Sequence, residues 1–395
     1  MHEIEEHYYQ INQNFLKILG LWPYQQSNFA RLRKVLFLGI LSGYIIVQLL
    51  SFLTMQFSVN LLLKIFTFVF PTLFVTIKYC IFITQAENVK LLLEQIRDDW
   101  NLLNGKLEID IIKQYASSVR LISMIAIVFC HFDTLCYVTV ELLPLILDVI
   151  SPLNKSRSLK LIANTEYFVN REKYIWVMLL HEITAIYIRV ITVCCTSVTI
   201  MMYILHACAL FKVASYRMKN ALGEDVLVIP NSLKEYLLYQ RIAHVVIIHR
   251  RAIAYIELWI SSFTVTFTIL ILIGVSSLSF NLFHLFQIIT VNTDFAELYA
   301  VLISIVAHFG YMFIINYGGE IVQNHGIQVF EATYNGLWYA SPFRIQKLVL
   351  FIMQRAIVKI NLTCGNIFVA SLEGFVTLAS SAISYFTVIY STRGN

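Results

Sequence analysis

Long runs of apolar residues alternate with shorter polar connections along the whole chain. A helix that crosses a bilayer needs about 20 predominantly apolar residues. Seven runs reach this length: 35–57, 65–83, 121–143, 175–211, 258–282, 298–317 and 362–390. The pattern therefore predicts an all-α polytopic membrane protein with seven transmembrane helices.

Several connections between these runs keep a helical pattern. Residues 88–120 carry apolar side chains at helical spacing: Leu92, Ile96, Leu103, Leu107 and Ile111. After the fourth run the chain continues without glycine or proline until Gly223, residues 233–256 lead into the fifth run, and 318–339 extend the sixth. We expect helices 4 to 6 to extend beyond the bilayer and to form a helical anchor layer in the cytosol.

The distribution of basic residues predicts the orientation in the membrane. The N-terminal segment and the second, fourth and sixth connections together hold 20 Lys and Arg, whereas the opposite side holds 7. Because loops rich in Lys and Arg stay in the cytosol, the N-terminus is predicted to be cytosolic and the C-terminus extracellular. Seven spans in this orientation are the reverse of a G-protein-coupled receptor, so no G protein is expected as a partner.

Composition excludes several classes of function. Hydrophobic residues make up 58% of the 395 residues and charged residues only 13%, about half the charged fraction of a soluble domain. The net charge of +5 is small, and we infer no nucleic-acid partner from it. The seven cysteines lack the paired spacing of a zinc site. We also find no phosphate-binding loop, HExxH or GxSxG motif, so neither an enzyme nor a cofactor is predicted.

Ionisable residues inside the apolar runs are candidates for function. His131 and Asp133 lie in the third run, and His181, Glu182 and Arg189 in the fourth. They would form a metal site or proton relay only with partners from other helices. Two further readings are packing inside the bundle, with Asp133 or Glu182 compensating Arg189, and contact with a ligand.

Aromatic residues suggest a ligand cavity between the helices. The chain contains 28 Phe and 22 Tyr, many in the predicted outer halves of the spans. Such a cavity suits a small, volatile, mostly apolar ligand that is bound by shape and dispersion, although core and lipid-facing positions explain single aromatics equally well. The candidate ligand-binding residues are Phe70, Phe74, Phe132, Cys136, Tyr137, Tyr187 and Val190.

Small and hydroxyl-bearing residues form one stripe on the last predicted helix. They recur at steps of three and four: Ala370, Gly374, Thr377, Ser381, Ser384 and Val388. Such a stripe fits close helix packing and fits equally well the wall of a wet pore with an apolar constriction.

The loop over residues 144–174 contains a sequon. Asn154 is a candidate for glycosylation if this loop is lumenal. A second sequon at Asn361 lies at the predicted cytosolic face and should be unused.

The C-terminal motifs of the chain resemble a known signature. Tyr334-x3-Trp338-Tyr339, Pro342, Gln346-Lys347, Gly365 and the closing Ser384-Tyr385-Phe386-Thr387-Val388 resemble the C-terminal signature of insect odorant receptors. The stretches around Asp98-Asp99-Trp100, His206 and Ser215-Tyr216-Arg217 are similar to that family too. The related gustatory receptors end in Thr-Tyr-x5-Gln-Phe, whereas this chain has Ser384-Tyr385-x5-Ser391-Thr392.

The resemblance implies a subunit of an odorant-gated, non-selective cation channel. Members of the family assemble as heterotetramers with a shared co-receptor in the plasma membrane of olfactory sensory neuron dendrites. It implies an inter-subunit anchor at Tyr334, Trp338 and Tyr339, and a pore with its gate at Val388, Ser391 and Thr392, lined by Ser384 and Ser381. The co-receptor carries glutamine in place of Ser391 and a larger apolar residue in place of Thr392, and it has a longer fourth connection. This chain therefore resembles a ligand-tuning subunit.

These inferences divide the chain into four segments. Residues 1–34 form a cytosolic segment, 35–330 the first six helices with the ligand-binding bundle, 331–361 the anchor, and 362–395 the pore helix with a short extracellular tail. The alternatives are a gustatory-type receptor channel and a secondary transporter that uses Glu373, Asp133, Glu182 and Arg189. The transporter reading lacks the two related halves that such proteins usually show.

Overall fold

A computed structural model describes residues 2–103, 105–151, 157, 159, 161–291, 295–365 and 367–393. The side chains of residues 2–6, 231, 291, 392 and 393 are outside this description. The elements in order are α1 (His2–Ile18), α2 (Asn28–Thr54), α3 (Val59–Thr84), α4 (Ala86–Leu102), α5 (Lys106–Glu141), α6 (Leu143–Ile150), α7 (Arg171–Ala221), η1 (Glu224–Leu227), α8 (Asn231–Val291), α9 (Phe295–Tyr334), η2 (Trp338–Ala340), α10 (Phe343–Ala356), β1 (Thr363–Cys364), β2 (Phe368–Val369) and α11 (Leu372–Arg393).

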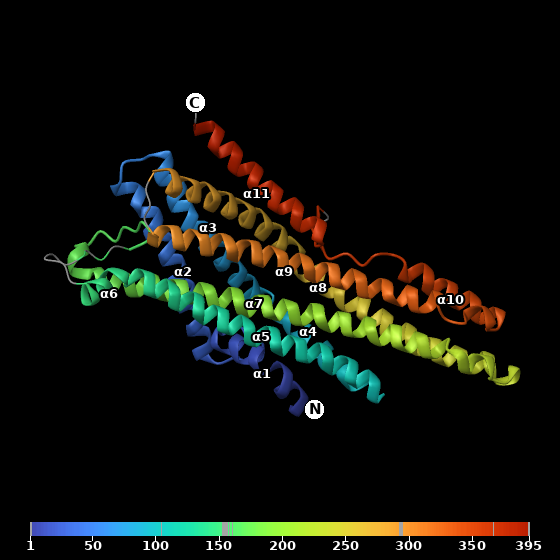
Figure 1. Cartoon of the computed structure of the whole chain (residues 1–395). Coiled ribbons are helices and arrows are strands. Elements are labelled where there is room, and N and C mark those ends of the chain that lie inside the picture. Colours follow the sequence, from blue (N-terminus) through green and yellow to red (C-terminus); the bar gives the residue numbers. More distant parts are fainter. Residues whose placement is uncertain are drawn as a thin grey trace.

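Seven of these helices are long and apolar enough to cross a membrane. They are α2, α3, α5, α7, α8, α9 and α11, and they confirm the predicted all-α architecture with seven transmembrane helices. The long helices run roughly alongside one another, and α11 leans across α8 and α9 at an angle (Figure 1). Helix α7 is central and contacts α2, α3, α5, α8 and α9.

Short polar side chains fix where three of the helices begin. The Ser27 hydroxyl accepts a hydrogen bond from the Ala30 amide at the start of α2, and Ser58 serves α3 in the same way. The Asn170 side chain accepts from the Lys173 amide at the start of α7. Each cap satisfies an amide that has no partner within its helix.

The outer surface of the bundle is apolar. Large hydrophobic side chains exposed on α2, α5, α7, α8 and α9 include Leu53, Phe129, Trp176, Leu272 and Val306. Contiguous apolar surface of this extent is covered by lipid or by another protein. Together with the seven apolar helices, it characterises a multi-pass membrane protein.

The predicted extension of the fourth, fifth and sixth helices is confirmed. Helix α8 has 61 residues, and at 1.5 Å per residue it is about 90 Å long, three times the hydrocarbon thickness of about 30 Å. The far ends of α7, α8 and α9 pack with α10 around a separate core that contains Met218, Leu238, Val245, Val349 and Ile352. This layer forms the right-hand end of the molecule in Figure 1.

A buried carboxylate joins three helices beneath the bundle. Asp99 of α4 is fully buried; its Oδ2 lies 2.9 Å from His206 Nε2 of α7, and its Oδ1 accepts from the Arg251 guanidinium of α8. Two of the motif stretches recognised in the sequence, at Asp99 and His206, therefore meet in space.

The last predicted span differs from the structure at its start. Hydropathy predicts one span over 362–390, but Thr363–Cys364 and Phe368–Val369 pair as two short antiparallel strands, and α11 begins only at Leu372. Gly365 has φ of +60°, in the left-handed region that favours glycine, and a Cβ there would lie 2.6 Å from Thr268 Oγ1. This turn ends any helix that hydropathy alone would continue.

The amphipathic stretch 88–120 is also interrupted. Helix α4 ends at Leu102 and α5 begins at Lys106. Leu92, Ile96 and Leu103 are buried as their spacing predicts, whereas Leu107 is exposed. The third spanning helix therefore begins 15 residues before the predicted apolar run, at Lys106 rather than at Leu121.

Candidate functional site

Glu182 of α7 is the centre of a polar cluster inside the bundle. Its side chain is fully buried. Oε1 accepts hydrogen bonds from the Tyr44 hydroxyl of α2 at 3.2 Å, the Tyr137 hydroxyl of α5 at 3.0 Å and the Ala163 amide at 3.4 Å. One carboxylate oxygen therefore joins two other helices and the loop that precedes α7.

A second buried carboxyl, Glu141 at the end of α5, shares the Tyr137 hydroxyl. Glu141 Oε1 lies 3.2 Å from that hydroxyl and accepts from the Ile162 amide at 3.2 Å. A phenol has one proton to donate, so Tyr137 can donate to only one of the two carboxyls. The single hydroxyl of Tyr137 therefore bridges the two carboxyls.

The loop over residues 161–170 covers this cluster. The Glu166 amide donates to the Val47 carbonyl of α2 at 2.8 Å, and the Tyr167 hydroxyl lies 2.8 Å from His181 Nδ1 of α7. Burial raises the pKa of the Tyr167 phenol above its ordinary value, so the hydroxyl keeps its proton. The loop thus ties α2 to α7 at this end of the bundle.

A different polar group lies deeper, between α3, α7 and α9. Lys78 is 1% exposed. Its Nζ lies 3.1 Å from Ser197 Oγ, 3.2 Å from the Tyr311 hydroxyl and 4.5 Å from the centre of the Tyr311 ring. The edge of Phe74 meets the same ring, with 5.3 Å between ring centres.

The charge of Arg189 acts on both Asp133 and Glu182, as the sequence suggested, but without direct contact. Its guanidinium donates to Thr72 Oγ1 at 3.5 Å. In the part of the chain that the structure describes, it forms no ion pair with Asp133 or Glu182. Among the same residues, no group of His, Cys, Asp and Glu could hold a metal ion.

The predicted ligand-binding residues fall into two groups. Phe70 and Phe74 of α3 face α8 and α9, where they meet Phe280, at 4.9 Å between ring centres, and Tyr311. The others lie on α5 and α7: Tyr137 in the carboxylate cluster, Tyr187 against the His131 ring, Cys136 beside Tyr299 of α9, Val190 partly buried against the core, and Phe132 exposed.

Several residues of these clusters were not singled out by the sequence, among them Tyr44, Lys78 and Tyr311. Lys78 had a usable signal, because it is the one charged residue in the apolar run 65–83 and an isolated charge in such a run marks a site. The two tyrosines had none, since nothing distinguishes them from the other 20.

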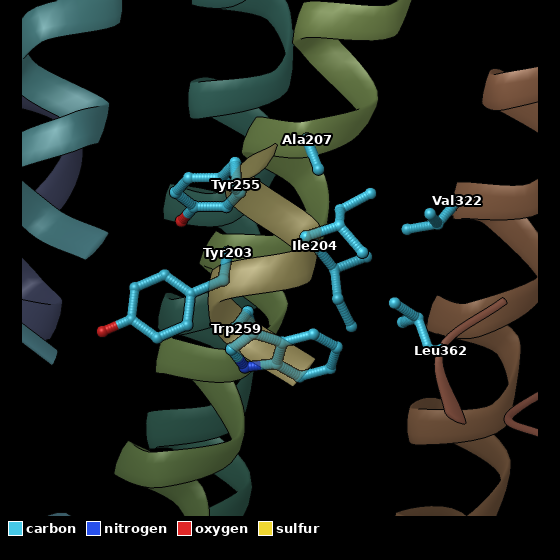
Figure 2. Close-up of a pocket in the computed structure, with 8 residues that line it drawn as sticks. Tyr203, Ile204, Ala207, Tyr255, Trp259, Val322 and Leu362 are labelled. Carbon is cyan, nitrogen blue, oxygen red and sulfur yellow. The ribbon is translucent and has the colours of Figure 1, made fainter. Parts of the chain in front are cut away.

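Figure 2 shows a small gap where α7, α8, α9 and Leu362 meet. Tyr203, Ile204, Tyr255, Trp259 and Val322 line a space of about 10 Å³. This volume holds at most one water molecule, so the gap is a packing defect and not a ligand site.

Helix α11 packs on the bundle along one face. Leu378 and Ala382 are buried against α8 and α9, and the Ser279 hydroxyl of α8 donates to the Ala382 carbonyl at 3.0 Å. Ser384, Val388 and Ser391 are exposed, and Ser381 is partly buried. The predicted stripe is therefore split: Ala370 and Gly374 at its start are buried, whereas Thr377, Ser384 and Val388 are exposed. The side chain of Thr392 is outside the described residues.

The start of α11 is held by α9. Asn316 Oδ1 accepts from the Ser371 amide at 3.2 Å, and Glu320 Oε2 accepts from the Leu372 amide at 3.2 Å. A Cβ on Gly319 would lie 2.1 Å from the Ala370 carbonyl oxygen. Direct backbone contact at Gly319 and two side-chain acceptors therefore couple these helices.

The predicted anchor residues lie between α9 and α10. Tyr334 and Tyr339 are exposed, and Trp338 is partly buried, with its indole N–H donating to the Tyr334 carbonyl at 3.2 Å. Phe343, Leu350 and Phe351 of α10 are exposed beside them. The sequon residue Asn154 lies outside the described residues.

Comparison with known sequences decides the family. The sequence model described as 7tm Odorant receptor matches residues 33–383. The chain belongs to this family. The resemblance to insect odorant receptors drawn from the C-terminal motifs is thereby confirmed. Members of this family are receptor channels rather than enzymes.

A curated relative of this chain is distant in sequence. Odorant receptor 10 of Aedes albopictus is 26% identical over 141 residues, and the alignment covers 36% of each protein. The chain thus matches about a third of the length of that relative.

Solved structures agree over nearly the whole chain. The insect olfactory receptor OR5 from Machilis hrabei in complex with eugenol superposes with a TM-score of 0.78 at 15% identity, covering 99% of both chains. Another structure of the same receptor gives a TM-score of 0.66 at 13% identity over 98% of both chains. At such identities the agreement establishes the shared fold.

Proposed function

We propose that this chain is the ligand-tuning subunit of an odorant-gated, non-selective cation channel. A small volatile odorant binds within the transmembrane bundle, and the pore opens at a central axis shared with a co-receptor in a heterotetramer. The family membership supports this function. The shared fold with a receptor whose structure was determined in complex with eugenol supports it as well.

One structural observation carries the proposal: α9 contacts both the ligand bundle and the start of α11. Tyr311 of α9 belongs to the Lys78 cluster, and Asn316 and Glu320, within the next ten residues, hold the first amides of α11. A ligand that displaces Tyr311 therefore moves the helix on which α11 is supported. Packed interfaces pass such shifts on because they rearrange between discrete states.

The exposed face of α11 supplies the pore wall in this proposal. Ser381 and Ser384 line the path, and Val388, Ser391 and Thr392 form the outer constriction. Small hydroxyl side chains with an apolar ring near one end suit a pore that gates by dewetting. The exposure of Ser384, Val388 and Ser391 in the single chain leaves this face for other subunits.

The remaining parts follow from the same arrangement. Tyr334, Trp338 and Tyr339 lie next to the exposed apolar face of α10 and form the inter-subunit anchor. We propose that Phe70, Phe74, Phe132, Cys136, Tyr137, Tyr187 and Val190 contact the ligand. The N-terminus is cytosolic and the C-terminus extracellular, in the plasma membrane of olfactory sensory neuron dendrites.

Patch-clamp recording tests the proposal. We expect odorant-evoked cation current from cells that express both this chain and the co-receptor, and we expect it to persist when G-protein signalling is blocked. Cells with the co-receptor alone should lack the response to the same odorants. Saturable uptake of substrate without conductance, or current that needs a G protein, would contradict the proposal.

A further inference from the structure

Lys78 is a buried lysine without a carboxylate partner among the described residues. In the described residues, its Nζ contacts the Ser197 hydroxyl, the Tyr311 hydroxyl and the Tyr311 ring, and no carboxylate lies within ion-pair distance. The thiols of Cys194 and Cys195 also approach it. Burial of an uncompensated ammonium is strongly unfavourable, so an isolated lysine inside the bundle is a candidate for function.

The hydrogen bonds around Lys78 leave donors without acceptors. An ammonium has three N–H donors, of which Ser197 and Tyr311 take two. Ser197 uses its own proton on the Val193 carbonyl at 2.6 Å, so it only accepts from Lys78. The Tyr311 hydroxyl accepts from Lys78 and keeps its proton for a further partner. The third N–H and this O–H are complementary to an oxygen that accepts hydrogen bonds.

The surroundings of these donors are apolar and include one small residue. Phe74 packs against the Tyr311 ring, and Gly274 of α8 faces Phe74, with 3.7 Å between an ideal Cβ and the ring. Phe70 and Phe280 continue the aromatic wall along α3 and α8. A hydrocarbon chain or ring fits such a lining by dispersion and shape.

The two buried glutamates that would attract a cationic ligand lie at another level, and Asp133, which acts on Cys194 beside Lys78, is itself faced by Arg189. Glu182 and Ser197 are both on α7, 15 residues apart, which corresponds to about 22 Å along the helix. Glu141 lies beside Glu182, since both contact Tyr137. The surroundings of Lys78 therefore select against an amine, which would bring a second positive charge.

We propose that Lys78 and Tyr311 bind the oxygen of an odorant that carries a carbonyl or carboxylate group, with its hydrocarbon part against Phe74. The inference rests on the proposed function, because it names the ligand class of that receptor. Lys78 supplies the positive charge or donor, and Tyr311 supplies the second donor on the helix that supports α11. Ligand binding and the proposed gating movement thus share one residue.

The first test uses a matched panel of ligands on the channel expressed with its co-receptor. Hexanoic acid, hexanal, 2-hexanone, hexanol, hexylamine and hexane have the same chain length and differ in the polar group. We expect the acid or the carbonyl compounds to activate at concentrations at least tenfold below those of the amine and the alkane. A lower activating concentration for hexanoic acid than for hexanal indicates that Lys78 is charged. Equal activating concentrations indicate that the ligand oxygen is bound as an uncharged hydrogen-bond acceptor. An amine or alkane as potent as the best carbonyl compound would overturn the inference.

Variants separate Lys78 from general effects. Lys78→Met should raise the half-maximal concentration of the best carbonyl or acid ligand at least tenfold, Lys78→Arg should restore part of the loss, and Tyr311→Phe should give a smaller loss. Lys173→Met, an exposed lysine on α7, is the matched control. An unchanged ratio of carbonyl to amine potency in Lys78→Met would contradict the inference. If that variant does not reach the cell surface, Tyr311→Phe and the wild-type panel decide.

A binding measurement keeps this inference distinct from the proposed function. The melting temperature of the purified receptor with its co-receptor should rise with the acid or aldehyde and not with the amine. Such a rise without any odorant-evoked current would support the ligand class and contradict the channel function. Odorant-evoked current together with an equal rise in melting temperature for amine and acid would support the channel function and contradict the ligand class.

Discussion

The hydroxyl of Tyr137 on α5 lies 3.0 Å from Oε1 of Glu182 on α7. The same hydroxyl lies 3.2 Å from Glu141, so a single phenol separates two buried carboxyls. Because Tyr137 is on α5 and Glu182 is on α7, this hydroxyl links the two helices inside the bundle.

Replacement of this phenol should destabilise the bundle. Tyr137→Phe removes one donor and leaves two buried carboxyls without their bridge, a loss of about 1–3 kcal/mol. We expect a lower melting temperature of the detergent-solubilised receptor. Tyr187→Phe, which changes an exposed tyrosine whose recorded contact is the His131 ring, should leave the melting temperature unchanged. An equal change in melting temperature for both variants would show that the Tyr137 bridge does not stabilise the bundle.

Two adjacent aspartates on α4 should behave differently. Asp99 is buried between His206 and Arg251, whereas Asp98 is exposed. Asp99→Ala leaves the Arg251 charge without its partner, which costs about 3–5 kcal/mol for a buried pair and somewhat less here because Arg251 is a third exposed. We expect loss of surface expression for Asp99→Ala and little change for Asp98→Ala. Normal expression of both variants would argue against this junction as a structural support.

The acceptor at Asn316 should influence gating. Asn316→Ala removes the side chain that accepts from the partly buried Ser371 amide before α11, at a cost of about 1 kcal/mol. Because that amide belongs to the segment leading into the proposed pore helix, we expect a changed basal open probability in single-channel recording. Asn324→Ala alters an exposed residue two turns further along α9 and provides the control. The same basal open probability in both variants would show that this contact of α9 does not influence the gate.

A glycine pair on α9 offers a steric test. Gly319→Ala places a Cβ 2.1 Å from the Ala370 carbonyl oxygen, whereas nothing lies within 4 Å of a Cβ on Gly310. Overpacking of this kind costs about 1–3 kcal/mol, so Gly319→Ala should lower the melting temperature and the amplitude of the evoked current. Gly310→Ala should be neutral or slightly stabilising, because alanine favours a helix by up to about 1 kcal/mol. The opposite ranking would contradict the close packing of α9 on the hairpin.

The exposed stripe of α11 has its own test. If Val388 is the apolar constriction, Val388→Ala widens it and should raise leak current measured without odorant. Ser380→Ala, beside the stripe on the same helix, should leave the leak current as in the wild type. Unchanged leak current in both variants would indicate that this face only packs against other helices or lipid.

The sequence determined the architecture because bilayer physics acts on local composition. Each spanning segment must satisfy its own backbone and present apolar side chains, so seven apolar runs were enough to predict seven helices. The long extensions of α7, α8 and α9 were predictable for a similar reason, since an unbroken helical pattern without glycine or proline is also local. The C-terminal motifs identified the family.

Only the tertiary structure decided which residues meet. Lys78 and Tyr311 are 233 residues apart, and Tyr44 and Glu182 are 138 apart, and no local periodicity encodes such contacts. The start of α11 was mispredicted because hydropathy does not register the left-handed turn at Gly365 or its close contact with Thr268. Composition fixes which segments enter the membrane; the partner of each buried polar group depends on how those segments pack against one another.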